Sequence, residues 1–245
     1  MTVDGVKLKP FAGLGSWAAF TNAADGAMMM GDTVVFQDEV NPAMDAAFSA
    51  GLEVSGLHNH FFFEEPKVFF MHIGGHGNPE KLAAAVKSVW DAVKKVRAGN
   101  AQPAAGFGGT AITTSLIEPA PLETIIGAKA QAQDGVAKFT IGRQATMHGV
   151  KVGAGMGATT WAAFSGDTKL AAMDGDFMMT SVEVQPVLRS LRQSGINVVA
   201  LHNHMVGEDP TSYFMHFWGK GPAADLAKAF KAALDLQTEA SRKAH

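Results

Sequence analysis

The tetrapeptide Leu57-His58-Asn59-His60 occurs again as Leu201-His202-Asn203-His204, at an offset of 144 residues (57 to 201). With that offset held fixed, further matches follow on both sides of the motif without a gap. The matched segments are 17–20 with 161–164, 31–32 with 175–176, 39–42 with 183–186, and 70–72 with 214–216. An internal repeat determines how a whole chain is divided, so it is established before any single element. The sequence therefore predicts two copies of one module.

The segment between the two copies has a different composition. Residues 98–116, RAGNAQPAAGFGGTAITTS, are rich in Gly, Ala, Thr and Pro and show no strong period, which is typical of a linker. We expect a first module at 1–97, this linker at 98–116, and a second module at 117–245. Residues 117–146 of the second copy would have counterparts before Met1, so we expect the first module to be shorter, either naturally or through trimming.

The pattern of apolar and turn residues within a copy predicts short strands in pairs, each pair followed by a helix. Pro42 is suited to the first turn of a short helix, and Gly51 is suited to its C-terminal cap. Apolar residues at helical spacing predict a second helix over 78–97. The predicted elements of the first copy are strands at 16–20 and 28–36, a helix at 42–50, strands at 52–63 and 67–74, and a helix at 78–97. The expected fold class is α+β, with two tandem repeats of a strand-strand-helix-strand-strand-helix module and antiparallel sheets.

Composition and charge exclude several classes of protein. The 245 residues are 47% hydrophobic and 18% charged, as in an ordinary folded chain. The formal net charge of −3 gives no basic excess for binding phosphates, so we expect no nucleic-acid partner. The absence of cysteine excludes disulfides and thiolate metal sites. No apolar run approaches the roughly 18 residues of a membrane span.

Six of the nine histidines form two copies of one pattern. The two predicted triads are His58, His60 and His72, and His202, His204 and His216. Residues two apart on a strand project from the same face. A turn centred on Pro66 would place His60 directly opposite His72, with Cβ atoms about 4.5–5.5 Å apart. We therefore expect three imidazoles to converge in each copy.

Three imidazoles without cysteine are typical of a catalytic zinc site, in which a fourth position is left for water. Copper or nickel also accept imidazole ligands. Glu64 and Glu208 follow the histidines on the same strand face, so each is a candidate catalytic residue, as a fourth ligand or as the group that moves a proton of bound water. The alternative is that the histidines are hydrogen-bonded core residues without a ligand.

Other residues recur in both copies, and most have a structural interpretation. Glu39 and Glu183 precede helices, where a carboxylate favours the helix N-terminus; a role in the site is the alternative. Asp32 and Asp176 follow glycine and are expected to hold turns. His76 has Lys220 as its counterpart, so the two sites are expected to differ.

Together these motifs resemble a known family. The pattern GD-x(6)-E-V-x-P, then G-x(5)-LHNH-x(3)-E-x-P-x(3)-FMH, then G-x-G before an Ala/Leu-rich helix is similar to that of the LppY/LpqO family, also called DUF1259. The resemblance covers residues 1–91 and 117–236. Members are typically exported bacterial proteins and some are lipoproteins, which implies a periplasmic or extracellular location. This chain has no signal sequence or lipobox cysteine, which fits a mature or trimmed form. The family has no established activity to carry over.

The leading hypothesis is a metal-binding bacterial envelope protein with a three-His site in each repeat. It would be a zinc-dependent hydrolase or lyase acting on a small-molecule substrate, with the metal activating water and Glu64 or Glu208 moving the proton. The alternatives are a periplasmic copper or zinc carrier or sensor, and a non-catalytic ligand-binding module. The sequence does not decide whether the protein is an enzyme, nor does it predict an oligomeric state.

Overall fold

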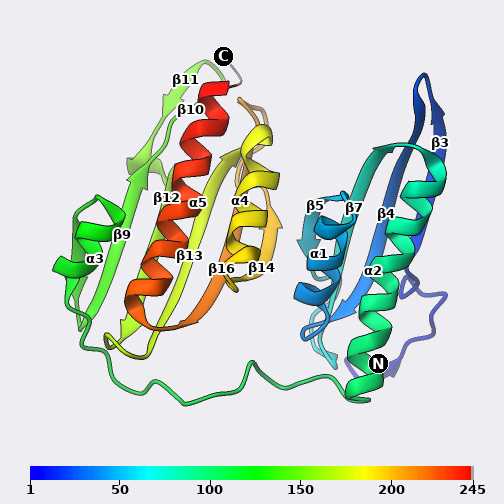
Figure 1. Cartoon of the computed structure of the whole chain (residues 1–245), viewed down its shortest axis with the longest axis horizontal. Helices are drawn as coiled ribbons and strands as arrows, with labels where there is room; N and C mark the ends of the chain where they lie inside the picture. The colour runs from blue at the N-terminus through cyan, green and yellow to red at the C-terminus, as the bar shows by residue number, and fades with distance from the viewer. Residues whose placement is uncertain (244–245) are drawn as a thin grey trace. The chain divides into compact units, whose positions relative to one another are not determined.

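The computed structural model describes the backbone of residues 1–243 and the side chains of residues 1–237. The chain divides into two compact units, Met1–Gly109 and Thr110–His245 (Figure 1). The boundary between them falls inside the segment that we expect to be a linker. Each unit is described separately below.

The first unit is an antiparallel sheet with two helices. Its strand order is β3-β4-β7-β5. The strands are β3 (Trp17–Ala23), β4 (Gly26–Phe36), β5 (Glu53–His58) and β7 (Val68–Gly77), and the helices are α1 (Val40–Ser49) and α2 (Pro79–Gly99). A separate three-stranded sheet has the order β2-β1-β6 and consists of β1 (Thr2–Val3), β2 (Val6–Lys7) and β6 (Glu64–Glu65).

The second unit has the same elements and several more. Its sheet has the order β14-β16-β13-β12-β9-β8. The strands are β8 (Ala130–Gln133), β9 (Val136–Gly142), β12 (Thr159–Gly166), β13 (Ala171–Thr180), β14 (Asn197–His202) and β16 (Ser212–Gly221). The helices are α3 (Pro119–Ile126), α4 (Ser181–Gln193) and α5 (Ala223–Lys243), with a short 3₁₀ turn η1 (Ala154–Met156). The small sheet has the order β11-β10-β15, from β10 (Ala145–Met147), β11 (Val150–Val152) and β15 (Glu208–Asp209).

The predicted fold of two simple strand-strand-helix-strand-strand-helix repeats is wrong. Ten strands of the described chain lie in the main antiparallel sheet structure, four in the first unit and six in the second. The second unit adds α3, β8 and β9, and both units carry a further small sheet. The short strands β6 and β15 pair outside the main sheet, with β1 and β10. The α+β class and the antiparallel pairing do describe the structure.

The helices of each unit cover one face of its sheet (Figure 1). Helix α2 begins where the Asn78 side chain accepts from the Lys81 N–H and Pro79 supplies the first turn. On β7, Gly75 faces the helices, since a Cβ there would lie 2.8 Å from a Leu82 methyl group. Neighbouring strand residues alternate between faces, so His72 lies on the face opposite the helices. The predicted metal-binding residues therefore lie on the helix-free face.

No helix in the described part of the chain has the length and apolar character needed to span a membrane.

Candidate metal centre

The register of the strands differs from the one expected for a tight turn at Pro66. In β5 and β7, Gly56 pairs with His72 and His58 pairs with Phe70, so the pairing is centred on Glu64. The expectation that His60 lies directly opposite His72 is therefore wrong. The physical reason is that residues between β5 and β7 do not form a tight hairpin, since they include β6, which pairs with β1.

In the second unit the three histidines nevertheless converge. His202 pairs with Phe214 and His216 with Ala200, which puts both histidines on one face as diagonal neighbours. His204 follows the end of β14, and its ring stacks on Phe214 with centroids 3.5 Å apart. The ring nitrogens available for coordination in His202, His204 and His216 all lie within 4.8 Å of one another. Two strands and one aromatic platform thus assemble the group.

The first unit has a related arrangement with one added contact. His60 stacks on Phe70 with centroids 3.3 Å apart, as His204 does on Phe214. His58 Nε2 and His72 Nε2 are 2.8 Å apart, so one of these rings donates a hydrogen bond to the other. The structure therefore brings His58 and His72 into direct contact and places His60 beside them, 5.2 Å from His58 between ring centroids. Among the described residues, only the triad of the second unit has all three ring nitrogens within 4.8 Å of one another.

The asparagine between the first two histidines of each motif holds the loop that carries the second one. Asn203 Nδ2 donates to the Ser212 carbonyl at 2.8 Å, and Asn59 Nδ2 donates to the Val68 carbonyl at the same distance. Each bond joins the residue that follows β14 or β5 to the first residue of its partner strand, β16 or β7. The position of His204 or His60 over its phenylalanine is thereby fixed.

Glu208 and Glu64, the predicted catalytic residues, are engaged with this loop. Glu208 is buried, and its Oε1 accepts from the Ser212 N–H at 2.8 Å. Glu64 accepts from Asn59 Nδ2 at 3.4 Å. In the described part of the chain, no carboxylate, neither that of Glu208 nor that of Asp176, belongs to the group of atoms that all lie within 4.8 Å of one another. Glu208 supports the loop, whereas Glu64 makes only a long contact to it.

Two aspartates near the histidines were missed by the sequence analysis. Asp32 pairs directly with His72, and Asp176 with His216, across the central strands. The expectation that they hold turns is wrong, because both lie inside long strands and are buried. The signal was present in the sequence: the Gly-Asp pair recurs in both copies at the common offset.

The glycine of each Gly-Asp pair explains why the dipeptide recurs. A Cβ on Gly175 would lie 2.2 Å from the Trp161 carbonyl oxygen and 2.3 Å from a Phe217 ring carbon. A Cβ on Gly31 would lie 2.8 Å from the Trp17 carbonyl oxygen. The neighbouring strands therefore leave no room for a side chain at the glycine position, which faces the helices. The aspartate that follows each glycine faces the opposite, helix-free side of the sheet.

Glu39 and Glu183 lie at helix starts, apart from the histidines. Glu183 completes a capping box with Thr180 at the start of α4 and contacts Arg143 at 2.7 Å. Glu39 accepts from the Phe36 N–H at 2.7 Å and contacts Arg97. Burial raises the pKa of Glu39, while the Phe36 N–H and Arg97 oppose that rise. Glu183 serves the capping role, one of its two interpretations. Glu39 stands at the start of α1 but, among the described residues, makes no side-chain hydrogen bond that caps the helix, and it accepts instead from the Phe36 N–H that precedes it.

His76, which makes the two copies unequal, lies outside the triad of the first unit. Its Nε2 is 2.9 Å from Asp25 Oδ1 at the turn between β3 and β4, and both side chains are exposed. It is therefore a natural control residue for the histidines that converge.

Burial favours the neutral form of one imidazole in each triad. Burial lowers the pKa of His204, Asp176 opposes this, and His202 and His216 lower it further. Burial likewise lowers the pKa of His60, with His58 and His72 adding to the effect and Asp32 opposing it. A neutral imidazole is the form that binds a metal ion.

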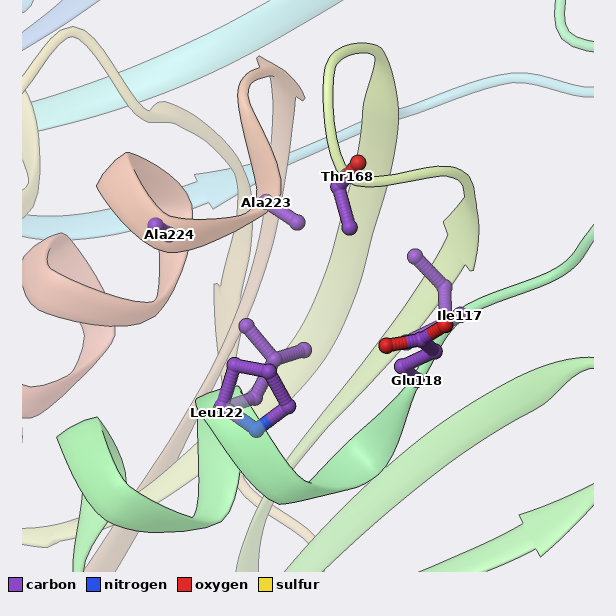
Figure 2. Close-up of a pocket in the computed structure, with 7 residues that line it drawn as sticks. Ile117, Glu118, Leu122, Thr168, Ala223 and Ala224 are labelled. Carbon is purple, nitrogen blue, oxygen red and sulfur yellow. The ribbon is translucent and has the colours of Figure 1, made fainter.

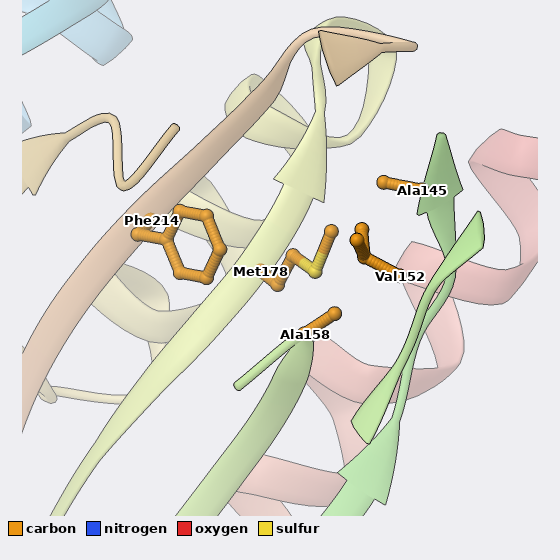
Figure 3. Close-up of a cluster of buried hydrophobic side chains, with 5 residues drawn as sticks. All are labelled: Ala145, Val152, Ala158, Met178 and Phe214. Atoms are coloured by element: carbon orange, nitrogen blue, oxygen red, sulfur yellow. The ribbon is translucent and has the colours of Figure 1, made fainter. Parts of the chain in front are cut away.

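The platform under His204 is anchored by a small hydrophobic cluster. Figure 3 shows Met178 and Phe214 of the main sheet facing Ala145 and Val152 of the small sheet, with Ala158 beside them. All five are buried. The small sheet thus packs on the helix-free face next to the histidines and fixes the ring on which His204 stacks.

One further cavity lies away from the histidines. It is lined by Ile117, Glu118, Pro121, Leu122, Thr168, Ala223 and Ala224 (Figure 2). Its volume of about 60 Å³ is enough for a few water molecules and too small for a substrate. We interpret it as a packing gap between α3 and the start of α5.

Comparisons with solved structures found shell proteins of bacterial microcompartments. The trimeric shell protein PduB is 12% identical, with 93% of this chain and 88% of that chain covered and a TM-score of 0.27. EutL from Clostridium perfringens is 11% identical, with 94% and 93% covered and a TM-score of 0.28. At such TM-scores these likenesses carry no argument about fold or function. No curated protein matches the sequence.

A comparison with protein families gave one match. The family described as Domain of Unknown Function (DUF1259) matches residues 1–92 and 120–236. The two matched segments include both histidine motifs and both Gly-Asp pairs. Since they make up most of the chain, this protein belongs to the DUF1259 family.

Proposed function

We propose that this protein binds transition-metal ions through its histidine triads, one ion in each unit. The observation that carries the proposal is the convergence of His202, His204 and His216, whose ring nitrogens lie within 4.8 Å of one another. The corresponding ion in the first unit would be held by His58, His60 and His72. The recurrence of the same three histidines at the common offset supports a second site in the first unit.

Zinc is the ion that we propose first, with copper or nickel as alternatives. Zinc–nitrogen distances are about 2.0–2.1 Å, so two nitrogens of a tetrahedral ion lie about 3.4 Å apart. The nitrogens of the second unit need only side-chain rotation to reach that spacing, because the triad side chains are at least partly exposed to solvent.

A zinc-dependent hydrolase or lyase is one chemistry for such a site. A bound zinc ion supplies Lewis acidity and lowers the pKa of water. The side chain of His204 is 39% exposed, so a small molecule has access to the triad. Glu208 would have to move a proton while it accepts the Ser212 N–H.

A metal carrier or sensor is the second candidate, and one observation favours it. Glu208 is committed to the loop backbone, so the predicted proton-transfer residue of the second unit is already engaged. Glu64 makes only a 3.4 Å contact to Asn59. The accessibility of the triad also suits an ion that is loaded and released.

The decisive experiment is metal analysis of the tag-free protein followed by zinc titration of the metal-free form. We expect uptake of up to two ions per chain. His60→Ala should remove one ion and His204→Ala the other, while His76→Ala, the exposed control, should remove none. If zinc, copper and nickel all show no stoichiometric uptake by the wild-type protein, the proposal is wrong.

We further propose that the protein is of the LppY/LpqO type and works in the bacterial envelope, in the periplasm or outside the cell. The proposal is supported by the motif pattern around the two LHNH segments. Fractionating cells of the source bacterium, with detection by an antibody against this chain, tests it. Recovery of the protein in the cytosolic fraction would contradict it.

A further inference from the structure

We infer that Asp176 and Asp32 each supply a carboxylate ligand to the metal ion bound by the neighbouring triad, so that each site has three imidazoles and one carboxylate. This inference rests on the proposed metal binding. It adds a ligand that the sequence analysis had placed in a turn, and it narrows the class of ion that the sites select.

The first argument is position. Asp176 lies on β13, directly across from His216 on β16, so the two side chains project from the same face. Its Oδ2 lies 3.7 Å from Nε2 of His204. This distance is too long for a direct hydrogen bond. It lies between about 3.4 Å, the separation of two ligands of a tetrahedral zinc ion, and about 4.1 Å, where the ion would lie on the line between them.

The second argument is burial without a partner. Asp176 is only 3% exposed and Asp32 only 8%. The Oδ1 atom of each is buried and has no hydrogen-bond partner among the described residues. A buried carboxylate is strongly unfavourable unless it is paired, hydrogen-bonded or bound to a metal. A divalent ion among the histidines would supply the missing partner in both units.

The third argument is that nearby cations serve other carboxylates. Arg143 contacts Glu183, and Arg97 contacts Glu39 and Asp38. Among the described side chains, neither Asp32 nor Asp176 pairs with a lysine or an arginine. An ordinary structural ion pair therefore does not explain why the aspartate recurs in both copies.

A carboxylate ligand changes which ion the site prefers. Hard oxygen ligands suit divalent ions, whereas soft sulfur ligands select copper(I). Three neutral imidazoles and one carboxylate would reduce the charge of a divalent ion from +2 to +1. We therefore expect selection of zinc or another divalent ion over copper(I). For a tetrahedral ion the carboxylate fills the fourth position, which is typical of a site that holds the metal.

The test measures zinc affinity at one site at a time. In a His58→Ala/His60→Ala background, only the second unit should bind zinc. Zinc affinity is compared between this double variant and the same variant that also carries Asp176→Asn. The amide keeps the shape of the side chain and removes its charge. We expect zinc affinity to fall at least roughly tenfold in competition with a chromophoric chelator. The matched control is Asp174→Asn, on the same strand and face. Its carboxylate interacts electrostatically with Lys138 and His216, so its loss should lower the affinity by much less than Asp176→Asn.

Cobalt(II) provides a second readout, because its visible spectrum reports the number and type of ligands. Loss of Asp176 should change the spectrum, while Asp174→Asn should preserve it. The metal-free Asp176→Asn protein should unfold cooperatively and close to the wild-type temperature, because the amide keeps the shape of the buried side chain; this separates a lost ligand from a lost fold.

The outcomes are distinguishable. If Asp176→Asn keeps wild-type zinc affinity and the cobalt spectrum while the histidine variants lose binding, the carboxylate is not a ligand and the triads remain a metal site. If the wild-type chain binds no metal, the proposed function fails, and this inference fails with it.

Discussion

At the scale of single residues, the two stacked imidazoles predict how stability depends on pH. The pKa of His60 and of His204 is lowered from the usual 6.5, mainly by burial. The unfolded chain therefore binds these protons more readily than the folded chain. The stability of the metal-free protein should be unaffected by these groups well above pH 6.5 and should decrease as the pH falls through that value.

This prediction is measured by urea unfolding in the presence of a chelator, at about pH 7.5 and about pH 5. The wild-type protein should lose stability at the lower pH, and a His60→Asn/His204→Asn variant should lose less. The comparison is between the two pH dependences, because the substitutions also remove ring stacking. Equal pH dependences would show that other groups cause the loss.

A glycine beside each aspartate gives the second residue-scale prediction. Gly175→Ala should be strongly destabilising, because the new Cβ would lie 2.2 Å from backbone oxygen of Trp161. Overpacking of this kind costs about 1–3 kcal/mol. Gly31→Ala should cost less, since the corresponding distance is 2.8 Å.

Thermal or urea unfolding of the metal-free variants measures both effects. The control is Gly74→Ala, at a glycine inside strand β7. A Cβ added there would lie 3.7 Å from the Met29 carbonyl oxygen, which is an ordinary van der Waals contact. If the three variants have the same stability, close strand approach is not the reason for the repeated glycines.

At the scale of elements, the loop between β14 and β16 joins structure to chemistry. Glu208 accepts from the buried Ser212 N–H, and the loop carries His204. Glu208→Ala leaves that donor without a partner, which costs about 1–3 kcal/mol. Glu208→Gln retains an acceptor and should keep most of the stability and the zinc affinity.

Urea unfolding and zinc titration of both variants check this, with Glu64→Ala as the matched change in the first unit. Glu64 has only a long contact to Asn59, at 3.4 Å, so its loss should have a small effect. Destabilisation by Glu208→Gln as large as that by Glu208→Ala would mean that the charge, rather than the hydrogen bond, supports the loop.

The sequence predicted helices well and strand partners poorly, for physical reasons. Helix α2 has local signals, a capping Asn78 and apolar residues at helical spacing. The register of β5 and β7 depends on β6 pairing with β1, a contact between distant residues that no local pattern encodes. The six histidines could be singled out because residue type and spacing repeat. Asp176 was wrongly assigned to a turn because the strand opposite it, β16, is far away in the sequence.

At the scale of the whole molecule, the two units carry the same histidine motif in different surroundings. In the second unit β12 is paired on its outer side with β9, and Lys138 lies over Trp161, 4.1 Å from the ring centroid. In the first unit β3 pairs only with β4 among the described elements of its sheet, and Trp17 is exposed. The common offset thus preserves the histidine motif and not its environment.

The hydrogen bond between His58 and His72 in the first unit predicts that the two sites bind zinc with different affinity. In the first unit an ion must replace the 2.8 Å hydrogen bond between His58 and His72. Such a bond is worth about 1 kcal/mol, which corresponds to about a fivefold weaker Kd. Titration of His58→Ala/His60→Ala, which keeps the second site, should therefore show tighter binding than His202→Ala/His204→Ala, which keeps the first.

Gly56→Ala tests the cause of the difference. A Cβ on Gly56 would lie 2.9 Å from Cδ2 of His72, so it should turn the ring away from His58. The second unit already has alanine at this place, Ala200, opposite His216. In the His202→Ala/His204→Ala background, Gly56→Ala should bring the first site closer to the affinity of the second. Binding that is equal from the outset, or tighter in the first unit, would show that the histidine hydrogen bond does not oppose metal binding.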